Sequence, residues 1–243
     1  MPKINALETG SSEQRNSLNH QAIEDYLKTI YMLAVEETPV TTSRIAEARD
    51  VKPGSVTSMI QRLAKLKLVN YEKHYGVTLT DAGTKVALEV IRHHRLIELF
   101  LIEALGFTWD EVHEQADILE HVISEKLEER IAAALNHPEF DPHGNPIPSR
   151  EGVMAAVAAE PLSGLAVGAR ARIAYVLNDE NSEMLRYLAD LGLTPGTVLE
   201  VKQVAPFAGP LTVEIDNESR VIGQTIASAV MVIAEPVDEP VAP

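Results

Sequence analysis

Residues 42–63 read TSRIAEARDVKPGSVTSMIQRL and contain the clearest structural signal in the chain. Apolar side chains recur at helical spacing before and after Val51–Gly54, where a proline and a glycine interrupt the pattern. Two short helices joined by a tight turn are typical of a helix-turn-helix, whose second helix lies in the major groove of DNA. The polar side chains that we expect to contact DNA from this second helix and its start are Lys52, Ser55, Thr57, Ser58, Gln61 and Arg62.

A β-hairpin is predicted directly after the helix pair. Leu68–Lys73 and Val77–Thr80 have the composition of strands and flank a turn at His74–Gly76. A hairpin at this place converts the motif into a winged helix, and Lys73 would contact phosphate from the wing. Similar helix pairs occur in bundles that do not bind DNA, but the hairpin favours the DNA-binding interpretation.

The charge distribution allows such a surface even though the formal net charge is −15. Residues 1–80 carry 10 Lys and Arg against 9 Asp and Glu, so the acidic excess lies in the rest of the chain. Within residues 42–75, three acidic side chains accompany seven basic ones, which are Arg44, Arg49, Lys52, Arg62, Lys65, Lys67 and Lys73. A local cationic patch is what a DNA-binding domain requires.

Composition excludes several other classes of protein. The 243 residues include no Cys, which removes a disulfide framework, a Cys-ligated zinc or iron–sulfur site and a thiol nucleophile. The N-terminus does not read as a signal peptide, and no apolar run approaches the roughly 18 residues of a membrane helix. We therefore expect a soluble, cytoplasmic protein.

The rest of the chain changes from helical to β-rich. We predict a long helix after Asp81 and another over about residues 109–135. Asn136–Ser149 contains four prolines and one glycine, a composition typical of a domain boundary. A small barrel-like module is indicated by one helix at about 182–191 and by strands at 168–175, 198–204, 211–215 and 229–233. The predicted fold class is mainly α with a β module.

Histidine and carboxylate side chains recur at helical spacing in the two middle helices. They are His94 with Glu98, and His113, Asp117 and His121 with Glu120 beside the last. Oxygen and nitrogen donors without sulfur suit Mn(II) or Fe(II). Solvated helix faces carry the same residue types, and His121 among apolar neighbours is also what a half-buried histidine looks like. Spacing alone leaves both interpretations open.

Further motifs follow one another in a fixed order: Tyr26–Tyr31, the helix-turn-helix with its wing, His93–Leu96, Val112–His121 and Pro142–Pro148. In this order, over about residues 20–235, the chain resembles the diphtheria-toxin-repressor family of metal-dependent transcriptional regulators. Residues 1–19 are polar and without periodicity, so we predict a flexible N-terminal arm there, and we predict a tail at 237–243. Between them, the resemblance implies a winged helix-turn-helix DNA-binding domain at 20–80, a dimerisation and metal-binding domain at 81–141, a Pro-rich linker at 142–160 and an SH3-like small β-barrel domain at 161–236.

The resemblance also implies two metal sites. The positions that match the family's regulatory site, which takes one ligand from the first helix and three from the dimerisation helix, are Asp25, Asp117, Glu120 and His121. The positions that match its second, ancillary site are His94, Glu98 and His113. Iron-responsive members add ligands there from the SH3-like domain, where the nearest acids are Asp179 and Glu180, and we expect Glu180 to contribute.

Departures from the family pattern bear on the metal. Iron-responsive members have Met at the position of Asp25 and Cys at that of Asp117, whereas manganese-responsive members have Asp and Glu and usually lack the third domain. Carboxylates in place of soft ligands favour Mn(II), although Fe(II) also binds them. Lys28 stands where manganese regulators offer a second carboxylate, which argues against a binuclear regulatory site. We expect Mn(II) as the cofactor, with Fe(II) as the alternative.

The function implied by the resemblance is repression of metal-uptake genes by a homodimer bound to a palindromic operator. A metallo-hydrolase with Glu120 as base is a rival from another class, but the chain has no His-Glu-x-x-His, nucleophile elbow or Gly-rich phosphate loop. We therefore expect no enzyme activity, no small organic substrate and no membrane partner. A DNA-binding protein with a degenerate metal site is the remaining alternative.

Overall fold

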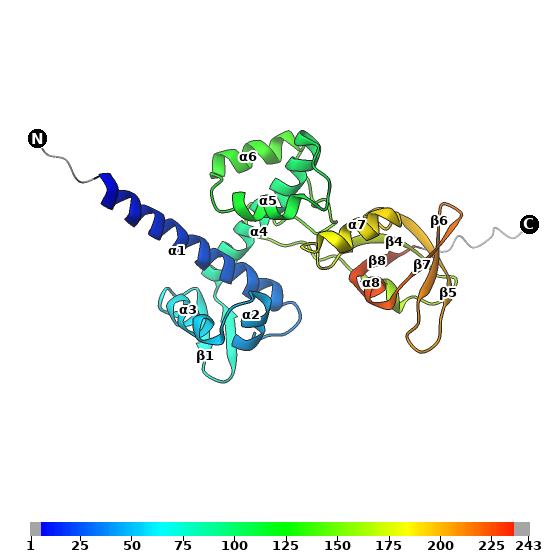
Figure 1. Cartoon of the computed structure of the whole chain (residues 1–243), viewed down its shortest axis with the longest axis horizontal. Helices are drawn as coiled ribbons and strands as arrows, with labels where there is room; N and C mark the ends of the chain where they lie inside the picture. Colours follow the sequence, from blue (N-terminus) through cyan, green and yellow to red (C-terminus); the bar gives the residue numbers. More distant parts are fainter. Residues whose placement is uncertain (1–5, 236–243) are drawn as a thin grey trace, which may run out of the picture. The chain divides into compact units, whose positions relative to one another are not determined.

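The computed structural model describes residues 6–235 (Figure 1). Contacts divide the chain into two compact units. Unit 1 comprises residues 1–92 and 148–153, and unit 2 comprises residues 93–147 and 154–243. The division falls inside helix α4 (Asp81–Leu105), between Arg92 and His93.

Unit 1 contains the winged helix-turn-helix that the sequence predicts. Its elements in chain order are α1 (Ala6–Leu33), α2 (Thr42–Ala48), α3 (Pro53–Lys65), the antiparallel strands β1 (Val69–Glu72) and β2 (Gly76–Leu79), and the first part of α4. The Thr41 hydroxyl caps α2 by accepting a hydrogen bond from the Arg44 backbone N–H. Pro53 occupies the first turn of α3, where an N–H has no partner within the helix. The largest fully buried side chains of this unit are Leu27, Ile30, Ile45, Ile60 and Leu63.

The predicted flexible arm at residues 1–19 is wrong for residues 6–19. Their backbone is helical, because α1 begins at Ala6 rather than at His20. Extending an existing helix adds one hydrogen bond per residue and needs no new nucleus, and residues 6–19 contain no proline to stop it. Residues 1–5 of the predicted arm, and residues 236–243 with the predicted tail, lie outside the described part of the chain.

The helical part of unit 2 consists of the rest of α4, α5 (Val112–Leu119) and α6 (Glu125–Ala134). The single helix predicted over about 109–135 is therefore broken between α5 and α6. Ser124 starts α6 by accepting a hydrogen bond from the Leu127 backbone N–H. Two small apolar clusters hold these helices, one around Leu96, Ile131, Ala132 and Ile147, the other around Ile97, Leu101, Val112 and Ala116.

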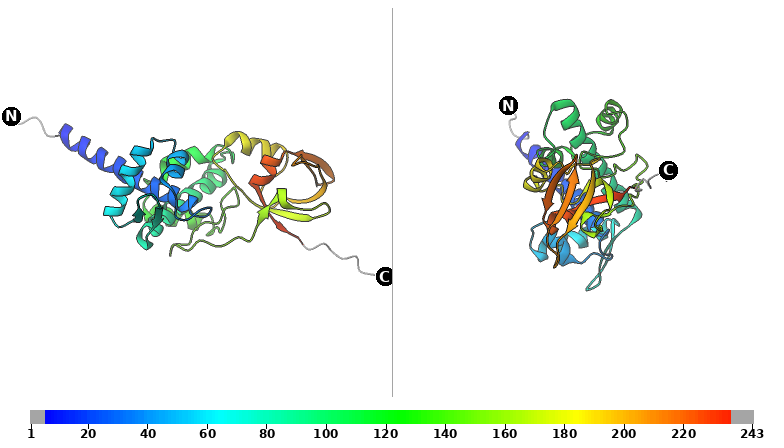
Figure 2. Two further views of the ribbon diagram at one scale, coloured as in Figure 1. Left: turned by 90° about the horizontal axis from the view of Figure 1, so that it is seen from below. Right: turned by 90° about the vertical axis from the view of Figure 1, so that its right-hand side faces the viewer.

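The β-rich module of unit 2 has a six-stranded antiparallel sheet with the strand order β3-β8-β4-β5-β6-β7. The right-hand view of Figure 2 shows strands of this sheet in yellow to red. The strands are β3 (Glu160–Pro161), β4 (Arg170–Val176), β5 (Val198–Val204), β6 (Leu211–Ile215), β7 (Glu218–Ile222) and β8 (Val230–Ala234), with helices α7 (Ser182–Asp190) and α8 (Gln224–Ala229) and a 3₁₀ turn at Leu162–Gly164. The four predicted strands and the predicted helix are confirmed, whereas β3, β7 and α8 were not predicted. The sheet of the described residues is not closed, because β3 and β7 form its two edges.

The start of the proline-rich segment after α6 is packed against the β-rich module instead of being exposed. Asp141, His143 and Asn145 are buried, and the Val176 backbone N–H of β4 donates to the His143 carbonyl oxygen. The Asp141 carboxylate accepts hydrogen bonds from the backbone N–H groups of His143 and Asn145, so a side chain supplies the hydrogen-bond acceptor for the backbone of this turn. Proline fixes φ even in the unfolded chain, so a proline-rich segment is as compatible with a packed turn of fixed structure as with an exposed linker. In the described part of the chain, no helix is both long and apolar enough to cross a membrane.

Candidate metal centre

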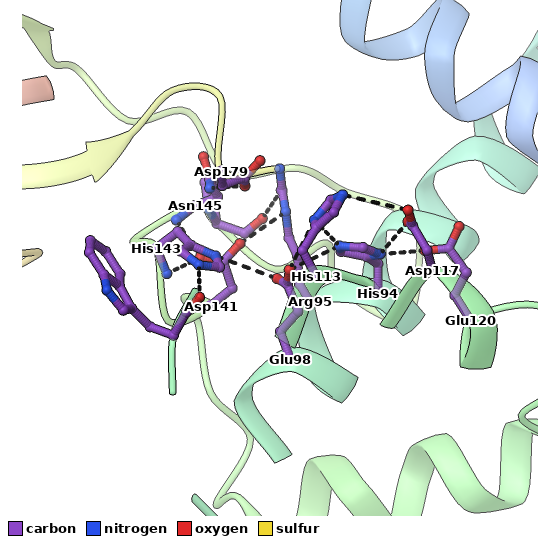
Figure 3. A network of polar contacts seen from close by, with 12 residues as sticks. His94, Arg95, Glu98, His113, Asp117, Glu120, Asp141, His143, Asn145 and Asp179 are labelled. Carbon is purple, nitrogen blue, oxygen red and sulfur yellow. Dashed lines mark hydrogen bonds and ion pairs between the residues drawn. The ribbon is translucent and has the colours of Figure 1, made fainter. Parts of the chain in front are cut away.

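Three of the predicted ligands converge inside unit 2 (Figure 3). His94 and Glu98 lie one turn apart on α4, and His113 reaches them from α5. His94 Nε2 lies 3.0 Å from Glu98 Oε1 and 3.1 Å from His113 Nδ1, and the third side of the triangle, from His113 Nδ1 to Glu98 Oε1, is 3.3 Å. Donor atoms about 2.1 Å from a common ion lie roughly 3.0–3.4 Å from one another, so one divalent cation fits this triangle.

Three of the predicted regulatory ligands, Asp117, Glu120 and His121, lie at the C-terminal end of α5 or directly after it. Glu120 Oε2 lies 2.5 Å from His94 Nδ1, and Glu120 Oε1 lies 3.3 Å from His121 Nε2. Asp117 Oδ1 lies 3.4 Å from His94 Nδ1, and the Asp117 side chain is 51% exposed. Glu120 is the C-cap residue of α5 and is buried.

Asp25, the fourth predicted regulatory ligand, belongs to unit 1. It lies on α1, where its Oδ2 accepts a hydrogen bond of 3.0 Å from the Arg49 guanidinium at the end of α2. The Arg49 guanidinium also donates to Thr29 and lies over the Tyr26 ring. Because the other three ligands belong to unit 2, their joint site stays a prediction.

A second group of buried polar side chains adjoins the first and was missed by sequence reasoning. It consists of Asp141 and His143 together with Glu98, which lies between the two groups in Figure 3. His143 Nε2 donates to the Trp109 carbonyl oxygen at 2.8 Å, and Arg95 Nε lies 3.3 Å from Asp141 Oδ2. The available signal was the sequence Asp-Pro-His-Gly-Asn at 141–145, in which chemically active residues alternate with turn formers.

The electrostatics of the second group attract positive charge. Burial would raise the pKa of Glu98, but the facing imidazoles of His94, His113 and His143 hold it well below its usual range. Burial, assisted by the charge of Glu98, raises the pKa of Asp141 to about 7. Burial alone would lower the pKa of His143, yet Glu98 and Asp141 raise it to about 9. A cation that binds here takes the place of protons on these groups.

Of the two acids of the SH3-like domain that were considered for the ancillary site, Asp179 and Glu180, the first contacts the 141–145 turn. Asp179 Oδ2 accepts a hydrogen bond of 2.9 Å from the Asn145 amide, which places this carboxylate beside the 141–145 turn. Glu180, the predicted ligand, is exposed. Among the described contacts, Asp179 is therefore the acid of this loop that reaches the centre.

The predicted DNA-contacting residues lie in unit 1, Lys73 in the hairpin turn and the others on α3 or at its N-cap. Lys52, Ser55, Ser58, Gln61, Arg62 and Lys73 are exposed, and Thr57 is half-buried. The hydroxyls of Thr57 and Ser58 donate to the carbonyl oxygens of Pro53 and Gly54, so their oxygens remain as acceptors. Arg62 contacts Asn19 of α1 at 3.1 Å. Val56, Ile60 and Leu63 hold the opposite face of α3 in the core.

Three family models match consecutive parts of the chain. The model of the iron-dependent repressor N-terminal DNA-binding domain matches residues 20–77, and that of the iron-dependent repressor metal-binding and dimerisation domain matches residues 80–149. The FeoA domain model matches residues 160–234. These matches agree with the described order of winged helix, helical region and β-rich module.

Individual relatives agree with the models. The chain is 39% identical to the iron-dependent repressor IdeR of Mycobacterium tuberculosis over 125 residues, which are 51% of this chain and 54% of IdeR. It thus spans about half the length of this relative. It is 31% identical to the diphtheria toxin repressor of Corynebacterium glutamicum over 187 residues, which cover 73% of this chain and 82% of that protein.

Solved structures give the same result. A manganese-dependent transcriptional repressor in complex with manganese has 37% sequence identity and a TM-score of 0.81, covering 88% of this chain and 100% of that one. With identities above 30% over most of two relatives and with domain models that follow in the same order, the chain belongs to the diphtheria-toxin-repressor family of metal-dependent transcriptional regulators.

Proposed function

We propose that the protein is a DNA-binding transcriptional repressor that is activated by a divalent metal ion. The observation that carries the proposal is the triangle of His94 Nε2, Glu98 Oε1 and His113 Nδ1 in a chain that also presents the exposed helix α3. The family consists of repressors rather than enzymes, so we assign the site no catalytic role.

The metal would act by linking the DNA-binding domain to the metal-binding domain. We assign the regulatory ion to Asp25 of α1 with Asp117, Glu120 and His121, as the sequence predicts. Without the ion, these carboxylates repel one another, whereas the bound ion favours the arrangement that binds DNA. An ion that binds this arrangement more tightly shifts the population towards it and raises the affinity for DNA.

Mn(II) is the ion that we propose, with Fe(II) as the alternative. The predicted ligands are carboxylates and imidazoles, and Mn(II) accepts hard oxygen ligands without requiring sulfur. The relatives include both a manganese-dependent repressor and the iron-dependent repressor IdeR. The two positions that distinguish iron-responsive from manganese-responsive members hold the carboxylates Asp25 and Asp117 here, which supports Mn(II) as the ion.

The proposed partner is double-stranded DNA with a palindromic sequence. One recognition helix reads a half-site, so two copies related by a two-fold axis read an inverted repeat. The family model for residues 80–149 describes a dimerisation domain, which supports a homodimer. We propose that the target genes encode metal uptake, and that the protein acts in the cytoplasm, where the DNA is.

A metal titration of DNA binding tests the proposal. Metal-free protein is mixed with fluorescent DNA from the upstream regions of the host's manganese- and iron-uptake genes, and anisotropy is followed while Mn(II) or anaerobic Fe(II) is added. Salt is kept constant, because phosphate contacts make the affinity salt-dependent. We expect binding only with metal and at lower Mn(II) than Fe(II). Equal DNA binding with and without metal would contradict the proposal and indicate a DNA-binding protein that does not respond to metal.

Two exposed residues of unit 1 should affect DNA binding differently. Gln61 on α3 is placed to read a base edge, so Gln61→Ala should weaken operator binding on the order of 10-fold while leaving non-specific binding unchanged. Lys73 on the wing is exposed where it can contact a DNA phosphate. Lys73→Ala should therefore weaken operator binding and non-specific binding alike, and it should reduce the salt dependence of the affinity by about one phosphate contact. Affinities at several salt concentrations for operator and scrambled DNA measure both effects, and equal losses on the two DNAs for Gln61→Ala would remove it from base recognition.

A further inference from the structure

An arginine side chain holds one of the proposed regulatory ligands. Arg49 is the C-cap residue of α2, and its guanidinium contacts α1. Its Nη2 donates to Asp25 Oδ2 at 3.0 Å, and its Nη1 donates to the Thr29 hydroxyl at 3.2 Å. The guanidinium also lies over the Tyr26 ring, with 4.8 Å from its central carbon to the ring centroid. Arg49 thus contacts three residues within about one turn of α1.

These contacts fix the guanidinium beside the Asp25 carboxylate. The Thr29 hydroxyl donates to the Asp25 carbonyl oxygen at 2.8 Å, so its lone pairs can accept the N–H of Arg49. The Arg49 and Asp25 side chains are each only 25% exposed, which limits the screening of their charges by water and salt. The charge of Arg49 therefore acts on Asp25 more strongly than that of an arginine on the open surface.

Hydrogen bonding alone does not explain an arginine at this position. Arg49 Nε is inaccessible to solvent and makes no hydrogen bond among the described residues. A buried N–H without a partner is unfavourable, so the side chain is not held by a complete set of acceptors. The strongest interaction that remains is the attraction between the guanidinium and the Asp25 carboxylate.

A metal ion bound to Asp25 has to accommodate this charge. If the ion uses one carboxylate oxygen while the guanidinium keeps the other, a divalent and a monovalent cation share one negative group and repel each other. If the ion uses both oxygens, the ion pair breaks and leaves the Arg49 guanidinium half-buried without its carboxylate. Either arrangement lowers the affinity for the ion. Fixing the carboxylate in advance helps the ion less, because the short aspartate side chain has little conformational entropy to lose.

We propose that Arg49 competes with the regulatory metal ion for Asp25 and thereby raises the metal concentration at which the protein responds. The guanidinium occupies the carboxylate while metal is scarce, and it opposes the ion when metal binds. The proposal rests on the assignment of the regulatory ion to Asp25 in the proposed function. Arg49 is not a ligand in this role but sets the affinity of one.

Uncharged side chains in place of Arg49 test the proposal. Arg49→Met keeps most of the length of the side chain and removes the charge, whereas Arg49→Gln also keeps an N–H donor for Asp25. Arg49→Lys keeps the charge. Arg44→Met is the matched control, because Arg44 also belongs to α2 but pairs with Glu36 and Glu47. Electron paramagnetic resonance of free Mn(II) measures binding to the metal-free full chain, and thermal unfolding shows whether each variant is folded.

The binding step that belongs to Asp25 is identified by Asp25→Asn, which should lose one Mn(II) per chain. For this step, Arg49→Met and Arg49→Gln should lower the Mn(II) concentration for half-saturation roughly 10-fold, whereas Arg49→Lys and Arg44→Met should stay within about 2-fold of wild type. In the Asp25→Asn background, Arg49→Met should change Mn(II) binding no further, because its effect passes through this carboxylate.

The outcome that overturns the proposal is a folded Arg49→Met protein that binds Mn(II) as wild type does or more weakly. Arg49 would then only hold α1 and α2 together. A gain of the same size in the Asp25→Asn background would overturn it as well, since the charge would act on another site. If Arg49→Met does not fold, Arg49→Gln against Arg49→Lys decides by the same criterion, because both keep a donor and differ in charge.

Failure of the proposed function is recognised separately. If Asp25→Asn binds as many Mn(II) ions as wild type, Asp25 is not a regulatory ligand, and both proposals are wrong. If Asp25→Asn loses its ion while the uncharged Arg49 variants bind Mn(II) as wild type does, only the role of Arg49 is wrong.

Discussion

The Asp25→Ala protein should bind operator DNA no more tightly with Mn(II) than without it, a loss of roughly 100-fold in metal-stimulated affinity. Asp25 is the one proposed regulatory ligand on the DNA-binding side, so without it an ion can occupy the other ligands and still fail to link the two domains. The measurement is the anisotropy titration with Mn(II) described above. A response to Mn(II) equal to that of wild type would contradict the linking role.

Two controls separate the role of Asp25 in metal binding from its role in the fold. Asp25 forms an ion pair with Arg49, in which both side chains are 25% exposed, so its loss should reduce the free energy of unfolding by about 1–3 kcal/mol. Asp25→Asn keeps an oxygen for the Arg49 guanidinium but removes the charge, and it should lose the response to metal as fully as alanine. Glu24→Ala removes the adjacent carboxylate, which pairs with His20, and should respond to Mn(II) like wild type.

The parts of the fold that local sequence determines were predictable. Pro53 and Gly54 between two amphipathic stretches fix the position of the turn, and the buried faces of α2 and α3 follow the expected spacing. The two-residue turn Asp216–Asn217 was not predicted, although Asp and Asn are residue types that tolerate the positive φ that both adopt here. Strand β7 after it was missed because its sequence, ESRVI, is polar on its exposed side.

The candidate site was predictable where its ligands share one helix. His94 and Glu98 lie on one face of α4 because four residues make about one turn, and His113 was found by the same spacing. Asp141 and His143 were missed because their position depends on the chain folding back onto α4. No periodicity reports that contact, and four prolines made the segment resemble a linker.

The break between α5 and α6 was not predicted, because apolar spacing typical of a helix continues across it. Residues 109–135 have helical apolar spacing throughout, yet α5 ends at Leu119 and places Glu120 inside unit 2. Ser124 followed by Glu125 and Glu128 in the first turn of the next helix was the available signal for a new start. Helix spacing drew attention to Asp117, Glu120 and His121 as candidate ligands, but only Asp117 lies within α5, and Glu120 and His121 follow its end.

Gly144→Ala should destabilise unit 2 by more than about 4 kcal/mol, the range of the most damaging single substitutions. Gly144 has φ +85°, and an added Cβ would lie 2.0 Å from the Ala174 carbonyl oxygen and 2.9 Å from Tyr175 Cα, both backbone atoms of β4. Neither can move away as a flexible side chain would. The 141–147 turn must therefore separate from β4, which exposes Asp141 and His143 and breaks the bond between Val176 N–H and the His143 carbonyl.

Gly168→Ala is the matched control, because this glycine has nearly the same φ, +86°, with no atom within 4 Å of an added Cβ. Its free energy of unfolding should fall by only about 1–2 kcal/mol, which is the cost of alanine in left-handed backbone. Urea unfolding followed by fluorescence measures both, since the single tryptophan, Trp109, stacks on His143 and packs on the core of the β-rich module. Equal losses for the two variants would show that the turn yields to the added methyl group, and that its packing against β4 contributes little to holding Asp141 and His143 in place.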